Sequence, residues 1–311
     1  MSTLICGSIA FDSIMVFRGR FKDHILPDKV HILNVAFLVP QLRREYGGTA
    51  GDIAYNLKLL GGDPLPMATV GNDAAAYLQR LDALGIPRTH IREVDDSYTA
   101  QAFITTDLDD NQITAFHPGA MSHSHLNEVP SDGSVRLGIV APDGRDGMLA
   151  HAAQFAERSI PFIFDPGQGL PMFEADELDE LMSHASVVVL NDYEAQLIVE
   201  KTGRSIETLS RNVGALIVTR GGQGSDIFVD SRVLHIPVAR TRRIVDPTGC
   251  GDAYRAGLLY GLANALDWES TGRLASVMGA LKIECSGAQN HVASRDEIAG
   301  RFSESFGFRP W

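Results

Sequence analysis

The segment at residues 187–194 reads Val187-Val188-Val189-Leu190-Asn191-Asp192-Tyr193-Glu194. Its four consecutive apolar residues predict a strand that is covered on both faces, because a strand with one wet face would alternate apolar and polar residues. Polar residues follow at once, and residues 194–201 then predict a helix. The chain therefore passes from a buried strand directly into a helix, as it does in α/β proteins.

Four other short apolar runs repeat this pattern along the chain. They lie at residues 4–9, 135–141, 162–164 and 216–218, with helical segments between them. Together they predict a doubly wound, mostly parallel α/β sheet with helices on both faces. Ligands of such sheets bind beyond the carboxyl ends of the strands. We expect a site at that edge, because polar residues follow each run, among them Asp12, Asp143, Asp165, Asn191 and Thr219.

Two stretches, residues 15–46 and 99–117, interrupt this rhythm. The first carries aromatic and basic residues without a clean period. The second predicts two short strands joined by an acidic turn at residues 107–111. We expect the two stretches to form a small β lid inserted into a single domain that spans residues 1–311.

The composition excludes several classes of protein. A formal net charge of −12 disfavours a nucleic-acid partner, because such binding depends on Lys and Arg neutralising phosphates. No run reaches about 18 uncharged apolar residues, and residues 1–10 lack a basic leader, so we expect no membrane partner. Three widely spaced cysteines, Cys6, Cys250 and Cys285, indicate free thiols and a cytoplasmic location.

The sharpest motif for chemistry is Asp246-Pro247-Thr248-Gly249-Cys250-Gly251-Asp252, directly before a helix of small residues. Glycines before a helix allow close backbone approach, and the free N–H groups of a helix start attract anions. Residues 249–251 therefore predict a phosphate cradle. Asp252 could accept a proton from a substrate hydroxyl, or it could simply cap the helix.

Four segments of the chain, taken in order, resemble the motifs of the ribokinase family, the phosphofructokinase B-type carbohydrate kinases. The resemblance is carried by the segment above, by Gly47-Gly48-Thr49-Ala50-Gly51-Asp52, by Asn191-Asp192-Tyr193-Glu194 and by Thr219-Arg220-Gly221-Gly222-Gln223-Gly224. Within the family the chain is most similar to bacterial adenosine and nucleoside kinases, through Gly7-Ser8-Ile9-Ala10-x-Asp12 and Phe116-His117-Pro118-Gly119. A ribokinase-like fold is thus expected for nearly the whole chain.

The resemblance implies phosphorylation of the 5′-hydroxyl of a ribonucleoside by ATP and Mg²⁺, with adenosine as the expected acceptor. Asp252 would be the catalytic base, and Gly249, Cys250 and Gly251 would form the anion hole. The nucleoside would be held by Ser8, Asp12, Phe37, Gly48, Asp52, Phe116 and Gln168. ATP would be held by Asn191, Thr219, Arg220, Gly222 and Gly224, with Glu194 organising the magnesium ion.

The chain departs from its relatives at several substrate-contact positions. Relatives generally carry Asn where this chain has Asp52, and an ionised carboxylate cannot donate a hydrogen bond as an amide does. Ala102 stands where a relative has Phe, and Gly169 where one has Gln, so we expect a roomier base pocket and broader nucleoside acceptance.

Two other functions stay open on the sequence alone. A ribokinase or other sugar kinase would use the same catalytic residues, and a non-catalytic nucleotide sensor would share the fold. The family often uses potassium near the loop of Asp246, so K⁺ is a further expected cofactor. The sequence also leaves a homodimer open.

Overall fold

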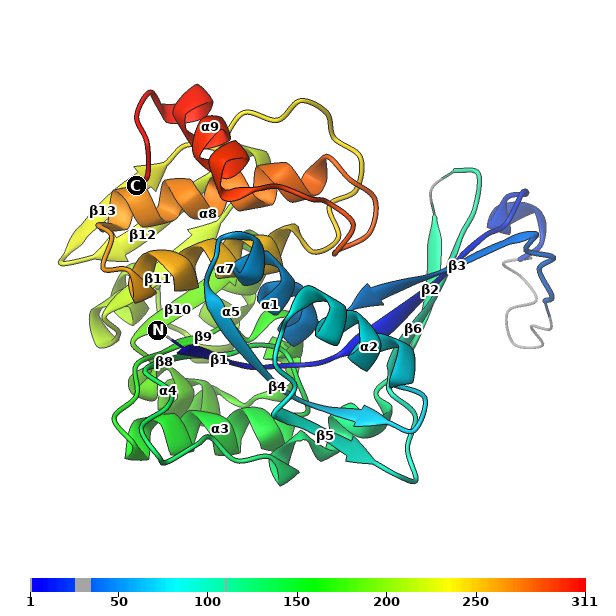
Figure 1. Ribbon diagram of the computed structural model, residues 1–311, viewed down its shortest axis with the longest axis horizontal. Coiled ribbons are helices and arrows are strands. Elements are labelled where there is room, and N and C mark those ends of the chain that lie inside the picture. Colours follow the sequence, from blue (N-terminus) through cyan, green and yellow to red (C-terminus); the bar gives the residue numbers. More distant parts are fainter. Residues whose placement is uncertain (1, 26–34, 110) are drawn as a thin grey trace.

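The computed structural model describes residues 2–25, 35–109 and 111–311, and within them the strands form two separate sheets (Figure 1). The large sheet has the order β13-β12-β11-β10-β9-β8-β1-β4-β5. Its strands are β1 (Ser2–Cys6), β4 (Asp63–Gly71), β5 (His90–Val94), β8 (Leu137–Val140), β9 (Phe162–Phe164), β10 (Val187–Asn191), β11 (Ala215–Thr219), β12 (Ser225–Val229) and β13 (Arg232–Ile236). The strands from β5 to β11 pair in parallel, whereas β12 and β13 are antiparallel, which confirms the mostly parallel sheet.

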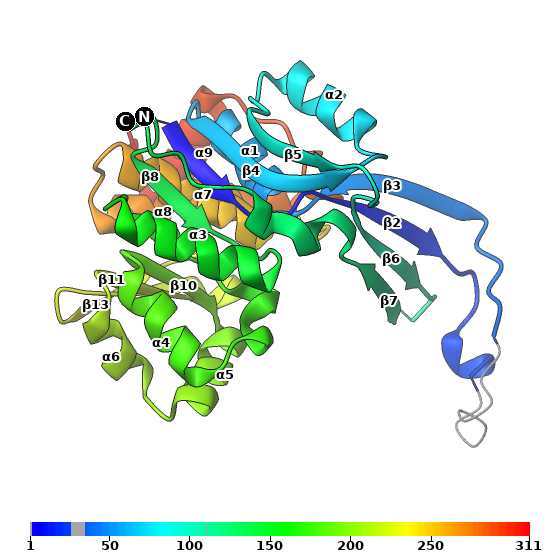
Figure 2. The same cartoon turned by 90° about the horizontal axis from the view of Figure 1, so that it is seen from below.

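Helices cover both faces of this sheet (Figures 1 and 2). One face carries α1 (Thr49–Leu59), α2 (Ala75–Leu84), α7 (Cys250–Ala263), α8 (Trp268–Ile283) and α9 (Arg295–Phe306). The other carries α3 (Arg145–Glu157), α4 (Ala175–His184), α5 (Asp192–Thr202) and the short α6 (Ile206–Leu209). Val187 and Val189 join the first core, and Val188 and Leu190 join the second. This explains why the run at residues 187–190 is continuously apolar.

The sequence patterns did not predict β4, β5, β12 or β13. β4 was hidden by Pro64 and Pro66, which are rare in central strands because proline has no N–H to donate. In the structure β4 pairs with β5 only from Met67 onward, so both prolines lie where β4 has a single neighbour, β1.

The second sheet is the expected lid, and it projects from the edge of the main body (Figure 1). Its order is β3-β2-β6-β7, from β2 (Ala10–Val16), β3 (Gln41–Gly47), β6 (Ala100–Thr106) and β7 (Gln112–His117). β2 thus starts at Ala10, before the expected boundary at residue 15, because the chain enters the lid almost directly from β1. Residues 26–34 of the expected lid lie outside the described residues.

No helix in the described ranges is both long enough and apolar enough to span a bilayer.

Candidate active site

A pocket of about 580 Å³ lies beyond the carboxyl ends of β1, β8, β9 and β10, where the lid meets the main sheet. Most of the residues expected to act in catalysis or to bind substrate line it, together with two of those expected to hold ATP and magnesium. They are Ser8, Asp12, Gly48, Asp52, Phe116, Gln168, Asn191, Glu194, Gly249, Gly251 and Asp252. The structure therefore brings together side chains that are up to 244 residues apart, from Ser8 to Asp252.

The backbone of the predicted cradle adopts a conformation that favours glycine. Gly249 has φ +79°, in the left-handed region that favours glycine, and a Cβ there would lie 2.7 Å from the Cβ of Ala288. The N–H of Cys250 donates to the carbonyl of Pro247 at 3.1 Å, which closes the turn into α7. The side chain of Cys250 does not line the pocket, and burial raises the pKa of its thiol to about 11. A neutral thiol is a poor nucleophile.

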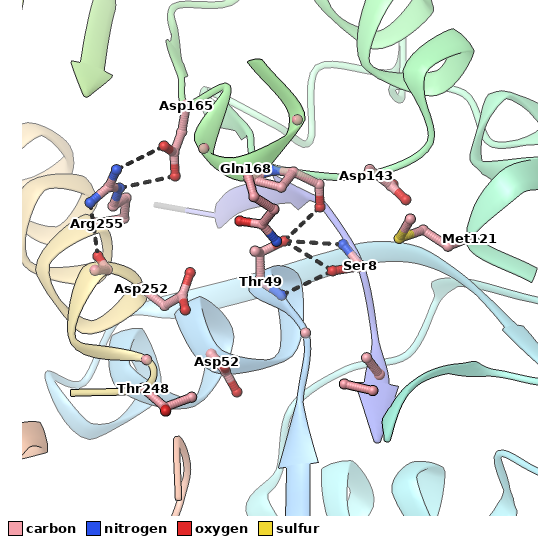
Figure 3. Close-up of a pocket in the computed structure, with 18 of the residues that line it drawn as sticks. Ser8, Thr49, Asp52, Met121, Asp143, Asp165, Gln168, Thr248, Asp252 and Arg255 are labelled. Carbon is pink, nitrogen blue, oxygen red and sulfur yellow. Dashed lines mark hydrogen bonds and ion pairs between the residues drawn. The ribbon is translucent and has the colours of Figure 1, made fainter. Parts of the chain in front are cut away.

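Asp252 stands on the first turn of α7 and faces the pocket (Figure 3). Burial raises the pKa of Asp252 to about 7, the positive charge of Arg255 lowers it, and the charge of Asp165 raises it again. Arg255 itself is held by Asp165, with Nε and Nη2 donating at 2.9 and 2.8 Å to the two carboxylate oxygens. A carboxyl group with this pKa can exchange a proton near neutral pH.

Asp52 lies on the first turn of α1, is 4% exposed, and lines the same pocket as Asp252 (Figure 3). The amide Nε2 of Gln289 donates to Oδ1 of Asp52 at 2.8 Å and to the hydroxyl of Tyr77 at 2.7 Å. Burial, and next the charge of Asp252, raise the pKa of Asp52 well above its usual range. The neutral carboxyl form is therefore favoured, and unlike a carboxylate it can donate a hydrogen bond.

The segments around Ser8 and Gly48 hold the pocket wall together. Thr49 N–H donates to Oγ of Ser8 at 3.1 Å, and Thr49 Oγ1 donates to the carbonyl of Pro142 at 2.9 Å. Gly48 has φ +88°, and a Cβ there would come within 2.5 Å of the backbone N of Ala10. Thr49 was not predicted as a site residue, although it stands inside the quoted glycine motif.

Asp12 is half-buried on β2 and also lines the pocket. Burial raises its pKa to about 6, and the charges of Glu45 and Asp246 add to this.

The lid end of the pocket is formed by Phe116 on β7 and Ala102 on β6, which are register partners. Phe116 is 52% exposed, so its ring is open to a ligand. Met121 and Met172 line the same pocket as Gln168 and Gly169. Thioether side chains adapt readily to different apolar ligands.

Asp143 is a pocket residue that sequence reasoning did not assign a role. It is 3% exposed, its Oδ1 accepts from Gly144 N–H at 2.9 Å, and Oδ2 has no hydrogen-bond partner among the described residues. Burial raises the pKa of Asp143 to about 8, against the lowering effect of the Gly144 N–H. Figure 3 draws Asp143 and Met121 on the far side of Ser8 from Asp252. Its position after a buried strand placed it at the expected edge of the sheet but indicated no particular role.

Asn191 and Glu194 form a capping box at the start of α5. Asn191 Oδ1 accepts from Glu194 N–H at 2.8 Å, and Glu194 accepts from Asn191 N–H at 2.8 Å and from its Nδ2 at 2.7 Å. Both residues also line the pocket, so Asn191 is a helix cap and a site residue at once. Both carboxylate oxygens of Glu194 are engaged, which fits contact with a magnesium ion through water better than direct ligation. Over the described ranges, no three His, Cys, Asp or Glu residues are grouped so that they could hold a metal ion.

The expected nucleotide loop lies outside this pocket. Thr219 ends β11, and Arg220, Gly222 and Gly224 follow it on the surface, with Arg220 paired to Asp226 at 2.5 Å. Gly224 has φ +86° and a Cβ there would lie 2.1 Å from the carbonyl of Ile236, whereas a Cβ on Gly222 would meet open space. Gly224 thus has a structural reason to be glycine, and Gly222 leaves room for a ligand.

Phe37 lies away from the pocket, in an aromatic cluster of the lid. Its ring centroid is 4.7 Å from that of Phe17 and 5.0 Å from that of Phe21. In this conformation Phe37 cannot touch a nucleoside bound beside Asp252.

A doubly wound sheet with a lid, a glycine cradle at a helix start and a carboxylate beside it define a small-molecule phosphotransferase. The chain belongs to the pfkB family of carbohydrate kinases, whose model matches residues 9–295. The family and the ribokinase-like fold expected from the sequence are thus confirmed.

Individual relatives are similar over nearly the full chain. A nucleoside kinase from Burkholderia thailandensis, solved in complex with inosine, is 52% identical with a TM-score of 0.90, covering 99% of each chain. A structure of the same enzyme in complex with ADP-inosine is 54% identical with a TM-score of 0.88, covering 99% of this chain and 97% of that one. A nucleoside kinase from Methanothermobacter thermautotrophicus is 31% identical over 99% of this chain and 97% of its own.

Proposed function

We propose that this kinase is a nucleoside kinase that transfers the γ-phosphoryl group of ATP to the 5′-hydroxyl of a ribonucleoside. The observation that carries the proposal is Asp252, which faces a nucleoside-sized pocket from the same helix start as Gly249 and Gly251. The similarity to an enzyme solved with inosine and with ADP-inosine supports a nucleoside and an adenine nucleotide as the ligands. The chain's free thiols suit the reducing cytoplasm, where ATP is available.

In the proposed reaction Asp252 takes the proton of the attacking 5′-hydroxyl. The phosphoryl group then passes over the start of α7, where backbone N–H groups and the positive end of the helix dipole stabilise its charge. Magnesium would neutralise phosphate charge, held through water near Glu194 and Asn191. Residues 219–224 would hold the nucleotide beyond the end of β11.

The ribose would lie over Gly48, with its hydroxyls on Asp12 and Asp52. Asp12 accepts hydrogen bonds when ionised, and neutral Asp52 can donate one, so the pair can serve both roles of a ribose hydroxyl. Each hydroxyl would then satisfy a buried polar group. A site of this kind rejects ligands that leave those groups unpaired.

The base would lie between Phe116 and the wall of Gln168, Met121 and Asp143. Any flat base can stack on the ring of Phe116, and methionine side chains can adapt to bases of different shape. Neutral Asp143, with its free Oδ2, could donate to or accept from a base edge. Phe37 would contact the nucleoside only after a movement of the lid.

A panel of acceptors tests this proposal by steady-state kinetics with MgATP. We expect adenosine and at least one other ribonucleoside, inosine or guanosine, to be used with kcat/KM values within about 100-fold of each other, or about 2.7 kcal/mol. The 2′-deoxyribonucleosides should be much poorer. Preference for ribose or fructose 6-phosphate would identify a sugar kinase, and absence of turnover with every acceptor would identify a sensor.

A further inference from the structure

One lysine is buried completely beside the cradle, where a charge is costly. Lys282, in the last turn of α8, is 0% exposed. Its Nζ donates to the carbonyl of Asp246 at 2.7 Å and to the carbonyl of Cys285 at 3.0 Å. Lysine is almost never fully buried without partners, because desolvation of its ammonium must be offset. The burial of the Lys282 ammonium therefore has to be explained by what it contacts.

The two carbonyls belong to the two loops that shape the start of α7. The carboxylate of Asp246 accepts from Thr248 N–H at 2.9 Å and from Gly287 N–H at 2.8 Å, so it ties the loops together. Gly249, the N-cap of α7, lies against Ala288 of the second loop. The ammonium of Lys282 thus sits at the junction that fixes the position of Gly249.

Backbone carbonyls are the ligands that proteins use for potassium. Potassium was expected near the loop of Asp246, yet here a fixed ammonium is already bonded to the carbonyls of Asp246 and Cys285. A potassium ion at these oxygens would also meet the like charge of Lys282, unscreened by water. The residues present therefore do not fit a potassium site at this junction.

We propose that Lys282 is a built-in monovalent cation that positions the phosphate cradle, so that catalysis needs no added potassium. The proposal rests on the proposed role of residues 249–251 in holding the transferred phosphoryl group. Lys282 touches no reacting atom. It acts through the loops of Asp246 and Cys285, and its positive charge near α7 adds to the field that favours an anion there.

The first test uses the unaltered enzyme. Nucleoside phosphorylation is measured at constant ionic strength in potassium, sodium and tetramethylammonium salts, and the rates should agree within about twofold. Activation of about tenfold or more by potassium would overturn the proposal. This measurement needs no variant, so it decides the matter even where a substitution prevents folding.

The second test compares two substitutions. Lys282→Ala removes the ammonium and leaves space, whereas Lys282→Met removes it and fills the space. We expect kcat of both to fall by at least about tenfold, with smaller changes in the KM for nucleoside. Potassium or ammonium ions should restore much of the loss in Lys282→Ala, and neither ion should help Lys282→Met. Lys58→Ala, which removes a lysine bonded at 2.9 Å to the carbonyl of Gly85 on the surface, is the matched control and should stay active.

A third readout is independent of turnover. Potassium should raise the Tm of Lys282→Ala above its value in tetramethylammonium, and should leave the Tm of the unaltered protein unchanged. This separates the inference from the proposed function, because it holds whichever acceptor the kinase uses. A folded Lys282→Ala protein that keeps full activity without potassium, or that gains neither activity nor stability from it, would refute the role of Lys282 as a cation.

Discussion

Asp12, Asp52 and Asp252 line one pocket, and burial raises the pKa of each. Burial is the largest cause of each shift, and the charge of Asp12 also disfavours ionisation of Asp52 and Asp252. Their roles nevertheless differ by position. Asp252 lies at the helix start that would hold the phosphoryl group, whereas Asp52, on α1, accepts a hydrogen bond from the loop residue Gln289.

Replacement of the proposed base tests the chemistry of the site. Asp252→Asn should lower kcat by about 10²–10⁴-fold, as expected for loss of a general base, while nucleotide binding measured by calorimetry stays near that of the parent. In the parent, kcat/KM should rise with pH through about 7 and then level off, because Asp252 must lose its proton to act. Near-normal turnover of the variant would return Asp252 to the role of a helix cap.

Asp52 stands where the family resemblance leads us to expect Asn. Because burial favours its neutral carboxyl form, Asp52 can present a donor and an acceptor, as an amide does. Asp52→Asn should therefore keep kcat/KM for adenosine within about tenfold of the parent, whereas Asp52→Ala should lose more than that. Equal losses in the two variants would mean that the ionised carboxylate is what the substrate needs.

Two elements, the start of α5 and the lid strand β2, serve both the fold and the pocket. Asn191 and Glu194 satisfy the exposed N–H groups at the start of α5, and the same residues reach the pocket. The lid is similar, since β2 begins three residues after Gly7 and carries Asp12 into the site before it leaves the main body. A movement of the lid would thus change the ribose contacts directly.

Lid closure should be visible by hydrogen exchange. The outer strands β3 and β7 pair on one side only, so their amides should exchange readily in the free protein. Addition of nucleoside should slow exchange in β3, β6 and β7, while β10 and β11 in the core serve as internal controls. Unchanged exchange throughout the lid strands would show that the lid does not close.

Over the whole molecule, buried acids with raised pKa values make stability depend on pH. The folded protein keeps protons on Asp143, Asp252 and Asp12 that the unfolded chain releases above about pH 4. These three groups therefore contribute stability that is greatest near pH 4 and is lost as pH rises, by about 1.4 kcal/mol per pH unit for each group until its folded pKa is passed. His151 and His291, whose pKa values burial lowers to about 4, act in the opposite direction below about pH 6.5.

Asp143→Asn isolates one of these contributions. Its free energy of unfolding, measured by denaturant titration from pH 5 to pH 8, should fall less steeply with pH than that of the parent, because an amide does not titrate. The exposed Asp146→Asn should follow the parent curve. Parallel curves for Asp143→Asn and the parent would show that Asp143 ionises in the folded state as it does in the unfolded chain.

The layered fold and most of the pocket residues could be predicted from the sequence alone. Continuous apolar runs that alternate with helical segments indicate a parallel sheet covered on both faces, and such a sheet places the residues after its strands on one edge. Ser8 and Asn191 were found in this way, whereas Asp252 was found through the glycine motif at the start of its helix. Local pattern could not reveal β4, whose prolines are tolerated only because of where β5 begins to pair.

The pKa values of the buried acids and the contacts between distant residues could not be predicted without the folded structure. Asp52 looked like an ionised carboxylate until its burial beside Asp252 was known, since a pKa depends on neighbours from the whole chain. Phe37 looked like a base contact, but its packing with Phe17 and Phe21 places it elsewhere. Lys282 stands on a helix as an ordinary lysine would, and it became a candidate cation only when folding enclosed it between two carbonyls far from each other in sequence.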